Sequence, residues 1–377
     1  MKIMHIGQMI GGLDIYIRNS IMNCKDESME FVIVCGKDDK HQPVIRKGKA
    51  IREHHISLYR NLNPLHDLTG FLQVIRCIVK ENPDIIHCHS AKGGIFGRVA
   101  GWLTGKKTFY TAHAFSFLCT SSHLKRQIFL FLERFTKMNA YLLACSESER
   151  MMGIQEVKYS EDHALLWHNS VPDINLPPEG NCPQPQDPYI CYIGRPCYQK
   201  NTLFLTEVMK QVKARGCPLK LQLLGVGYYS SELDELKEAI EKNGLKDTIS
   251  LQPWISHEEC LQIVKQSIFY ISTSRYEGLP LSIIEAMSLG KAIIASDVVG
   301  NKDCVSNGIN GYLLPLQASS FAEKIVMLWE DEKKRKELET ESRKIFVSDF
   351  CIDTQIDKLF MIYNKISSNH ICSSNPF

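Results

Sequence analysis

Short apolar runs alternate along this chain with longer amphipathic stretches, and this alternation is its main structural signal. In the first half the strand-like segments cover residues 2–8, 30–36, 51–58, 84–90, 107–113, 140–146 and 164–170. In the second half they cover residues 189–195, 220–226, 248–254, 267–273, 291–297 and 311–316. Apolar runs of this length, separated by helical patterns, are typical of strands in parallel sheets. The pattern therefore predicts an α/β protein with two doubly wound, Rossmann-like parallel sheets.

The chain has 377 residues, which favours two domains. Residues 174–188 are rich in proline and show no periodicity, so they are expected to form an extended linker. We predict a first domain over 1–173 and a second over 189–345. A C-terminal segment, 346–377, would hold an amphipathic helix at about 350–366, followed by a mobile tail. Ligands of such sheets bind at the carboxyl ends of strands, so two such domains would form a ligand-binding cleft.

Bulk composition narrows the class of protein. The formal net charge of +2 gives no support to nucleic-acid binding. No run of 18 apolar residues occurs, so no transmembrane helix is expected, and the first residues are typical of a strand rather than a signal peptide. The 14 cysteines are scattered, without a C-x-x-C pair. This usage favours a reduced, cytoplasmic protein over a disulfide framework.

The most informative stretch follows the apolar run at 267–273, where a loop leads into an apolar helical start. The helix is expected to begin with Pro280 at its first position, where the missing N–H costs nothing. Where a strand leads through a loop into a helix, the first backbone N–H groups of the helix have no intrahelical acceptors. They can therefore bind an anion such as phosphate. Glu277 would lie beside this anion, and Glu285 roughly 7 Å further along the helix axis. Two carboxylates that bind hydroxyls around a phosphate describe a nucleotide-sugar site.

Further motifs occur in order along the chain. They are GGLDIYIRN at 11–19, PDIIHCHSAKGGIFGRVAGWL at 83–103 with YTAHAFSF at 110–117, CYIGRPCYQKN at 191–201, and E-GLPLSII-E at 277–285 with NGINGYLLP at 307–315. A lone E-x7-E would mean little, but these ordered motifs span about residues 1 to 315. Together they make the chain resemble the family-4 retaining glycosyltransferases of the GT-B fold, in particular those that build capsule, O-antigen and exopolysaccharide.

The resemblance implies a retaining, metal-independent glycosyltransferase whose C-terminal helix crosses back to the first domain. Its partners would be a nucleoside diphosphate sugar and a glycan or lipid-linked acceptor, with no cofactor. The implied catalytic residues are His113, near the reacting carbon, and Glu277, on the sugar hydroxyls; Glu285 would hold the ribose. The implied donor-binding residues are Gly11, Gly12, Arg195, Lys200, Gly278, Leu279, Pro280, Leu281, Ser282 and Glu285. Retention could proceed through a covalent intermediate or by front-face attack, and we favour the front-face route.

Physical chemistry fits these assignments, although each residue also has a purely structural explanation. Arg195 and Lys200 would stabilise charge on the departing pyrophosphate, or would be ordinary surface cations. Gly11 and Gly12 would permit close approach of a ligand, or would simply form a tight turn. His113 at a strand end could instead be a structural histidine, and Ala114 after it replaces a frequent glycine of the family.

Other features leave alternatives open. His87 and His89 alternate on one strand, but no third metal ligand is found at suitable spacing, and no D-x-D occurs, so no catalytic metal is expected. Trp254 and Tyr276 could flank the nucleotide or be packing residues. Residues 124–138 mix cations with phenylalanines, which fits either docking on the cytoplasmic face of a membrane or a core-facing helix.

Two other functions remain possible from the sequence. A nucleotide-sugar 2-epimerase shares the expected fold and the donor but needs no acceptor. A non-catalytic scaffold that binds nucleotide sugar is the third alternative. The nucleotide base, the donor sugar, the acceptor and the linkage are not encoded in the motifs.

Overall fold

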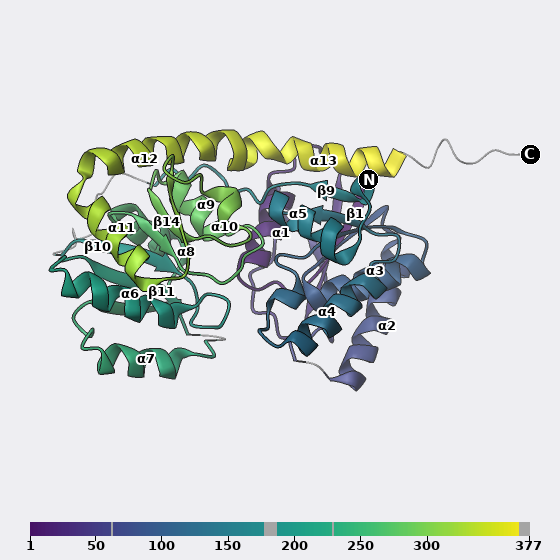
Figure 1. The fold of residues 1–377 in the computed structure, drawn as a ribbon. Helices are drawn as coiled ribbons and strands as arrows, with labels where there is room; N and C mark the ends of the chain where they lie inside the picture. The colour runs from purple at the N-terminus through teal and green to yellow at the C-terminus, as the bar shows by residue number, and fades with distance from the viewer. Residues whose placement is uncertain (62, 177–186, 228–229, 369–377) are drawn as a thin grey trace, which may run out of the picture. The chain divides into compact units, whose positions relative to one another are not determined.

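The computed structural model describes residues 1–61, 63–176, 187–227 and 230–368 (Figure 1). The chain divides into two compact units. Unit 1 comprises Met1–Pro172 together with the chain from Ile352 on, and unit 2 comprises Asp173–Cys351. Unit 2 thus runs beyond the predicted boundary at 345. Most of the predicted linker (177–186) and the predicted tail (369–377) lie outside the described residues.

Unit 1 contains a seven-stranded sheet with the order β5-β2-β1-β6-β7-β8-β9, in which all neighbours are parallel. Its strands are β1 (Lys2–Ile6), β2 (Glu30–Gly36), β5 (Arg52–Ile56), β6 (Ile85–His89), β7 (Lys107–Thr111), β8 (Tyr141–Ala144) and β9 (Ala164–Leu166). Each strand predicted for the first half is present. A small antiparallel pair, β3 (Ile45–Arg46) and β4 (Lys49–Ala50), was not predicted.

Helices cover both faces of this sheet. Successive residues of a strand point to opposite faces, so each face carries apolar side chains that helices bury. Met4 and Ile86 face a core shared with α2 (Pro64–Glu81), α3 (Ala91–Leu103) and α4 (His123–Thr136). Ile3 and Ile85 face a core shared with α1 (Gly12–Met22) and α13 (Ile352–Ser368). A short helix, α5 (Glu147–Met152), follows β8. The C-terminal helix therefore packs within unit 1.

Unit 2 contains a six-stranded parallel sheet with the order β12-β11-β10-β13-β14-β15. Its strands are β10 (Tyr189–Ile193), β11 (Lys220–Val226), β12 (Ile249–Pro253), β13 (Tyr270–Ser272), β14 (Ile293–Ser296) and β15 (Gly311–Leu314). Each was predicted from its apolar run. The two parallel sheets confirm the predicted fold class.

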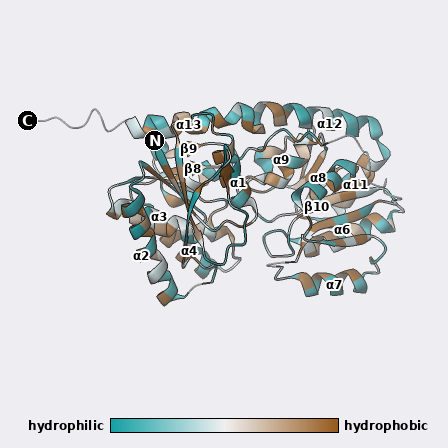
Figure 2. Ribbon diagram, turned by 180° about the vertical axis from the view of Figure 1, so that it is seen from behind, coloured by the Kyte–Doolittle hydropathy of each residue, from teal (hydrophilic) through white to brown (hydrophobic). Residues whose placement is uncertain are grey.

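The helices of unit 2 also pack on both faces of their sheet. One core is shared by α6 (Thr202–Ala214), α7 (Leu233–Lys242), α11 (Ala318–Glu330) and Leu338 of α12 (Glu332–Ile345). The helices α8 (His257–Gln266), α9 (Leu281–Ser288) and α10 (Asn301–Cys304) contribute nothing to that core. Along α7 the apolar residues Leu233, Leu236 and Ile240 recur at helical spacing among charged ones, as expected for a helix with one buried side (Figure 2).

The strand order creates a switch point in each sheet. In unit 1 the chain leaves β1 towards β2 and later returns to the other side of β1 with β6. In unit 2 it leaves β10 towards β11 and returns with β13. Ligands of open α/β sheets bind outside the carboxyl ends of strands at such points. Among the described residues, no helix combines the length and the apolar character needed to span a bilayer.

Candidate functional site

Glu277 is the best-anchored polar side chain at the switch point of unit 2. It lies on the loop after β13, and its side chain is only 7% exposed. Its Oε1 accepts hydrogen bonds from Lys200 Nζ at 2.6 Å and from Ser274 Oγ at 2.6 Å. Its Oε2 accepts from Gln199 Nε2 at 3.2 Å. A buried carboxylate needs such partners because leaving its charge unpaired is costly, so this carboxylate is both paired and fixed in orientation.

The backbone around Glu277 is fixed as well. The Glu277 N–H donates to the carbonyl of Val299 at 3.0 Å. Gly300 has φ +85°, and a Cβ there would come within 2.8 Å of the Glu277 backbone. Any side chain at Gly300 would therefore displace Glu277. The Arg275 N–H donates to the Gln199 carbonyl at 2.8 Å, which ties the loop after β13 to the loop after β10.

The helix after Glu277 starts one residue later than predicted. Pro280 has ψ 110°, which is outside the helical range, so it caps α9 and Leu281 is the first helical residue. Its carbonyl accepts from Ile283 N at 3.1 Å and Ile284 N at 3.2 Å. The prediction was wrong by one position because proline is favourable on either side of a helix start. The first turn of α9 still presents N–H groups without intrahelical acceptors, as an anion site requires.

Glu285 lies in the second turn of α9 and is 5% exposed. Its Oε1 is 2.8 Å from Nε2 of His257, at the start of α8. This hydrogen bond, together with the carboxylate charge, raises the pKa of His257 above its usual value. Sequence reasoning missed His257, although its position just after a predicted strand was a usable signal.

The two predicted phosphate-binding cations both lie on the loop that follows β10. Lys200 pairs with Glu277, and an ammonium has three N–H groups, so two donors remain. Arg195 is partly buried, and neither an ion pair nor a hydrogen bond joins its guanidinium to a described residue. The β10 loop therefore offers N–H donors beside Glu277.

In unit 1, His113 occupies a strained turn after β7. His113 and Ala114 have φ values of +52° and +80°, which cost non-glycine residues roughly 1–3 kcal/mol each. Glu149 of α5, which is 1% exposed, holds this turn. Its Oε1 accepts from Ala114 N at 2.8 Å, and its Oε2 accepts from Cys145 N at 2.9 Å. Sequence reasoning did not single out Glu149, since no local pattern links it to His113.

The histidines of β6 have a third neighbour, contrary to the sequence-based expectation. His5 of β1 pairs in register with His87, and ligand atoms of His5, His87 and His89 lie within 4.8 Å of one another. Burial lowers the pKa of His5 to about 3 and the pKa values of His87 and His89 well below the usual value. Both nitrogens of His87 are engaged, Nδ1 by Tyr363 OH at 2.6 Å and Nε2 by Thr111 Oγ1 at 2.8 Å. These contacts favour a hydrogen-bonded cluster over a metal centre.

Two predicted glycines lie at the start of α1, and two predicted aromatic residues lie in unit 2. Gly11 precedes α1 with φ +59° and open space around it, and Gly12 is the first residue of that helix. The positive φ explains glycine at position 11. Trp254 follows β12 and is 62% exposed, whereas Tyr276 is 8% exposed and therefore a packing residue in this conformation.

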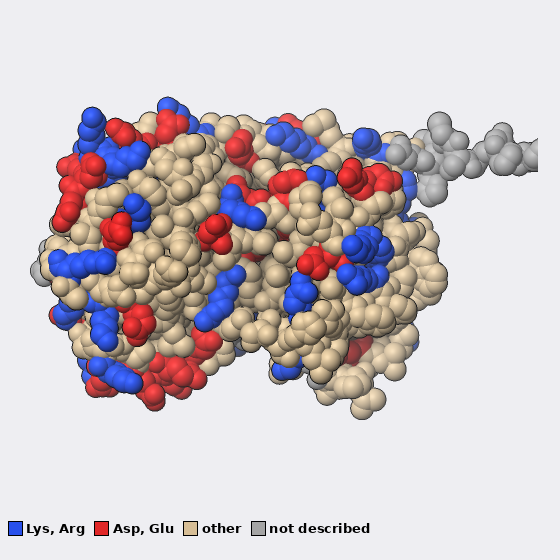
Figure 3. Space-filling view, viewed as in Figure 1, with Lys and Arg blue, Asp and Glu red and all other residues tan. Residues whose placement is uncertain are grey.

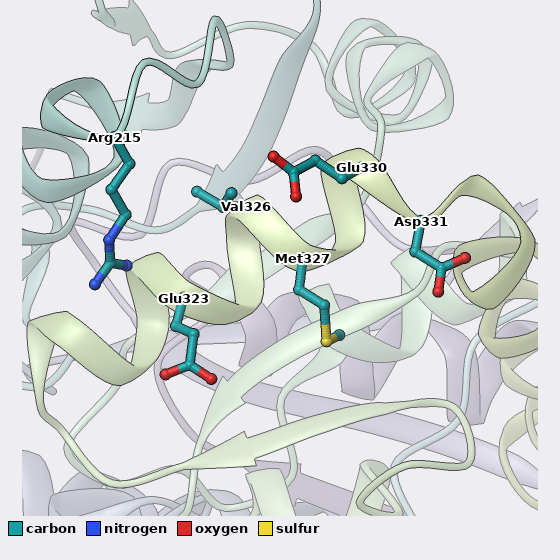
Figure 4. A pocket seen from close by; sticks show the side chains of 6 residues that line it. All are labelled: Arg215, Glu323, Val326, Met327, Glu330 and Asp331. Carbon is teal, nitrogen blue, oxygen red and sulfur yellow. The ribbon is translucent and has the colours of Figure 1, made fainter.

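A surface pocket elsewhere in unit 2 lies apart from these loops. The side chains around it come from α11 and from the residues that flank α6 and α11 (Figure 4). They are Arg215, Glu323, Val326, Met327, Glu330 and Asp331. None of them belongs to the loops after β10 or β13, so this pocket is not part of the candidate site.

The chain has two Rossmann-like parallel sheets. At the switch point of unit 2 lie an anchored carboxylate and the first turn of a helix, whose backbone N–H groups have no intrahelical acceptors. Together these features define a GT-B-type glycosyltransferase. Sequence comparison identifies the family. Residues 10–173 match the profile of Glycosyltransferase Family 4, and residues 179–345 match that of Glycosyl transferases group 1. The chain belongs to the family-4 glycosyltransferases.

Curated relatives cover most of the chain. An Escherichia coli UDP-Gal:α-D-GlcNAc-diphosphoundecaprenol α-1,3-galactosyltransferase is 27% identical over 321 residues, covering 81% of this chain and 82% of that protein. A Campylobacter jejuni N,N'-diacetylbacillosaminyl-diphospho-undecaprenol α-1,3-N-acetylgalactosaminyltransferase is 23% identical, covering 83% of this chain and 85% of that protein.

Solved structures share the fold. Sucrose-phosphate synthase from Thermosynechococcus elongatus superposes with a TM-score of 0.84 at 18% identity, covering 98% of this chain and 100% of that chain. Anabaena HepE in complex with UDP and glucose superposes with a TM-score of 0.78 at 17% identity, covering 97% of this chain and 99% of that chain. At these identities the likeness establishes the GT-B fold alone.

Proposed function

We propose that this protein is a retaining, metal-independent glycosyltransferase. It would transfer a sugar from a nucleoside diphosphate sugar to a lipid-linked glycan acceptor at the cytoplasmic face of a membrane, during surface polysaccharide assembly. The observation that carries the proposal is the anchored Glu277 between the β10 loop and the start of α9. The relatives from Escherichia coli and Campylobacter jejuni are named for undecaprenyl diphosphate-linked sugars, which supports this acceptor class.

In the proposed mechanism, the donor phosphates bind the first turn of α9 and the cations of the β10 loop. The bond from the anomeric carbon to the phosphate oxygen breaks, and negative charge grows on that oxygen. Arg195 and Lys200 stabilise this charge more strongly than they stabilise the bound donor. Glu277 accepts a hydrogen bond from a sugar hydroxyl, and Glu285 accepts one from the ribose.

Front-face attack fits the surroundings of Glu277 better than a covalent intermediate. Lys200, Ser274 and Gln199 donate to its two oxygens, which withdraws the electron density that a nucleophile would need. The acceptor hydroxyl would form its bond to the anomeric carbon on the face that the phosphate leaves. Its proton would pass to the departing phosphate oxygen. A glycosyl adduct trapped on Glu277 would contradict this route.

A ligand panel tests the donor class and the independence from metals. With EDTA present, UDP-, GDP-, ADP- and dTDP-sugars are compared by thermal shift, and one nucleotide should raise the midpoint. A ligand at 100 times its Kd stabilises by about 2.7 kcal/mol, which raises the midpoint by roughly 5–11 °C for a unit of this size. Adding Mg²⁺ or Mn²⁺ should change neither binding nor transfer. Activity lost in EDTA and restored by Mn²⁺ would refute metal independence.

Product analysis separates transfer from epimerisation. In the presence of acceptor, a glycosyltransferase releases nucleoside diphosphate in proportion to glycosylated product. An altered nucleotide sugar formed without any acceptor would instead identify an epimerase. A flat binding panel without either product would favour the non-catalytic scaffold.

The outer face of α4 supports a membrane contact. Leu124, Ile128, Phe131 and Phe135 follow one side of the helix and are 71%, 50%, 63% and 64% exposed. Phe131 and Phe135 stack on each other with ring centroids 5.8 Å apart. The core-facing side of α4 uses other residues, among them the buried Leu130. Packing in the core therefore does not account for these two phenylalanines.

Neighbouring helices extend this apolar surface. The helices α2, α3 and α4 lie side by side on one face of the unit 1 sheet (Figure 1). Their outer sides expose Leu65, Leu68, Leu72 and Val79 of α2 and Trp102 and Leu103 of α3. We define these residues, with Leu124, Ile128, Phe131 and Phe135, as the α2–α4 apolar surface. Exposed apolar residues gathered on three neighbouring helices are typical of an interaction site.

We propose that the occupant of the α2–α4 apolar surface is an anionic bilayer. The predicted cations contribute less than the sequence suggested, because Arg126 pairs with Glu156 at 3.0 Å and Arg134 donates to the Glu156 carbonyl at 2.8 Å. Lysine and arginine are interspersed with acidic residues on the face shown in Figure 3, without one large basic area. The phenylalanines, rather than charge, should therefore dominate membrane affinity.

Liposome co-sedimentation tests this contact. The double substitution Phe131→Ser with Phe135→Ser should weaken binding to anionic vesicles at least tenfold, because burying each phenylalanine contributes about 1.5–3 kcal/mol. Ile309→Ser removes an apolar residue of unit 2 that is 52% exposed and should leave binding intact. Unchanged binding in the double variant, or an equal loss in the control, would refute the membrane assignment.

A further inference from the structure

Three histidines of unit 1 form a continuous series of hydrogen-bonded imidazoles. His5 Nδ1 lies 3.0 Å from His89 Nε2, and His89 Nδ1 lies 3.3 Å from His113 Nε2. The rings of His5 and His89 are stacked, with centroids 5.3 Å apart. His5 and His89 are 1% and 0% exposed. The series therefore runs from the buried end of β1 to the partly exposed turn of His113.

Each imidazole in the series carries one N–H, because burial holds the pKa values of all three histidines below their usual value. A neutral imidazole with one N–H donates at one nitrogen and accepts at the other. Only two arrangements of protons satisfy both contacts. In one, every ring carries its N–H at Nδ1, and in the other every ring carries it at Nε2.

The buried end of the series decides between the two arrangements. His5 Nε2 is buried and has no hydrogen-bond partner among the described residues. If the N–H groups were at Nε2, this end would be a buried donor without an acceptor, which proteins avoid more strictly than an acceptor without a donor. The favoured arrangement therefore leaves a bare lone pair at His5 Nε2. His5 and then His89 donate through Nδ1, and His113 carries its own N–H at Nδ1.

We infer that His5 and His89 are positioning residues that fix His113 in its Nδ1–H tautomer. His113 Nδ1 then serves as a hydrogen-bond donor, and His113 does not serve as a base, since its only lone pair accepts from His89. The strained turn at His113 and Ala114, held by Glu149, fixes the ring's backbone in the same way. No local motif links His5 to His113; the hydrogen-bonded series does.

The catalytic part of this inference rests on the proposed glycosyltransferase function. An Nδ1–H donor suits a ligand oxygen that accepts a hydrogen bond, such as a donor-sugar oxygen near the reacting centre. It stabilises that oxygen without taking its proton. The acceptor's proton must then go elsewhere, which agrees with its transfer to the departing phosphate.

Nitrogen-15 NMR of the full-length protein measures the tautomer directly. Long-range proton–nitrogen correlation on ¹⁵N-histidine-labelled protein should show His113 protonated at Nδ1. His89→Phe removes the donor to His113 Nε2 and should shift His113 towards the Nε2–H form. His89→Asn places an amide N–H₂ near the position of the lost Nδ1 and should retain the Nδ1–H form.

Transfer assays complete the test. His89→Phe should lower kcat at least tenfold with a smaller change in the KM for the donor, and His89→Asn should recover part of that loss. His87→Gln is the matched control: it lies in the same buried cluster, but its nitrogens contact Tyr363 and Thr111, so the tautomer of His113 should not change.

The possible failures are distinguishable. An Nε2–H signal from His113 in the wild type would overturn the inference and leave the proposed transfer intact. An Nδ1–H form that persists in His89→Phe would equally overturn the role of His89. The predicted tautomer in a protein that binds no nucleotide sugar would refute the proposed function while the hydrogen-bonded series stands.

Discussion

Glu277→Gln should reduce kcat/KM for glycosyl transfer by about 10²–10³, the usual cost of losing one fixed electrostatic contact in a transition state. Lys200, Ser274 and Gln199 all donate to the Glu277 carboxylate, at 2.6, 2.6 and 3.2 Å. A neutral amide of the same shape cannot accept from all three, and it leaves the Lys200 ammonium without its counter-charge. The measurement is steady-state transfer with the nucleotide sugar selected by the thermal-shift panel.

Two controls separate lost chemistry from lost structure. Glu241→Gln alters an exposed carboxylate of unit 2, whose partner is Lys246, and should leave both activity and the unfolding midpoint near wild type. Circular dichroism of Glu277→Gln should show an intact fold, because Gly300 and the Val299 carbonyl still hold its backbone. Full activity in Glu277→Gln would remove this residue from the mechanism.

Acidification should destabilise unit 1 steeply between pH 6.5 and 5.5. His5, His87, His89 and His113 form one cluster of neutral imidazoles, and burial holds their folded-state pKa values well below the unfolded value of about 6.5. Below that pH the unfolded chain binds more protons than the folded chain, so stability falls as pH falls. The stabilising contribution of each histidine falls by about 1.4 kcal/mol per pH unit, which gives roughly 5–6 kcal/mol for the four at pH 5.5.

Thermal unfolding followed by the fluorescence of tryptophan, including Trp167 of unit 1, at pH 7.5, 6.5 and 5.5 measures this effect. Trp167 is 3% exposed, and its Nε1 donates to the carbonyl of Gln355, so its emission reports the core shared with α13. His5→Phe should reduce the pH dependence by about one quarter. A midpoint that stays constant from pH 7.5 to 5.5 would contradict the buried, neutral cluster.

His257 in unit 2 should respond in the opposite direction. Its hydrogen bond to Glu285 raises its pKa in the folded state, so its stabilising contribution is present at low pH and is lost as pH rises through that pKa. The contribution is small, because the His257 side chain is 55% exposed and its charge is screened by solvent. The acid sensitivity should therefore be concentrated in unit 1.

Strand positions and the candidate loops of unit 2 follow from local sequence. Buried parallel strands need continuous apolar runs, so most strands of both sheets could be located from hydropathy. The exception is β5, whose sequence REHHI is largely polar and which lies at the edge of its sheet. The loop of Glu277 could be located because a strand, a loop and a helix start succeed one another within a few residues. The prediction for Pro280 failed by one position, because sequence does not fix the ψ angle that separates a cap from a first turn.

The contacts that give the site its chemistry required the tertiary structure. Glu277 meets Lys200 because β10 and β13 are neighbours in the sheet, although the two residues are far apart in sequence. In the same way, the pairing of β1 with β6 brings His5 next to His87 and His89. From the sequence, His87 and His89 were an isolated pair. Glu149 reaches the turn of His113 from the helix after the neighbouring strand.

Sequence by itself determined the fold class, the family and most of the residues at both switch points. Tertiary structure alone decided their partners, the tautomer inferred for His113 and the outward orientation of Phe131 and Phe135 on α4. The physical reason is that hydropathy and turn chemistry act over a few residues along the chain. Hydrogen bonds between side chains depend instead on strand order, and strand order results from packing of the whole sheet.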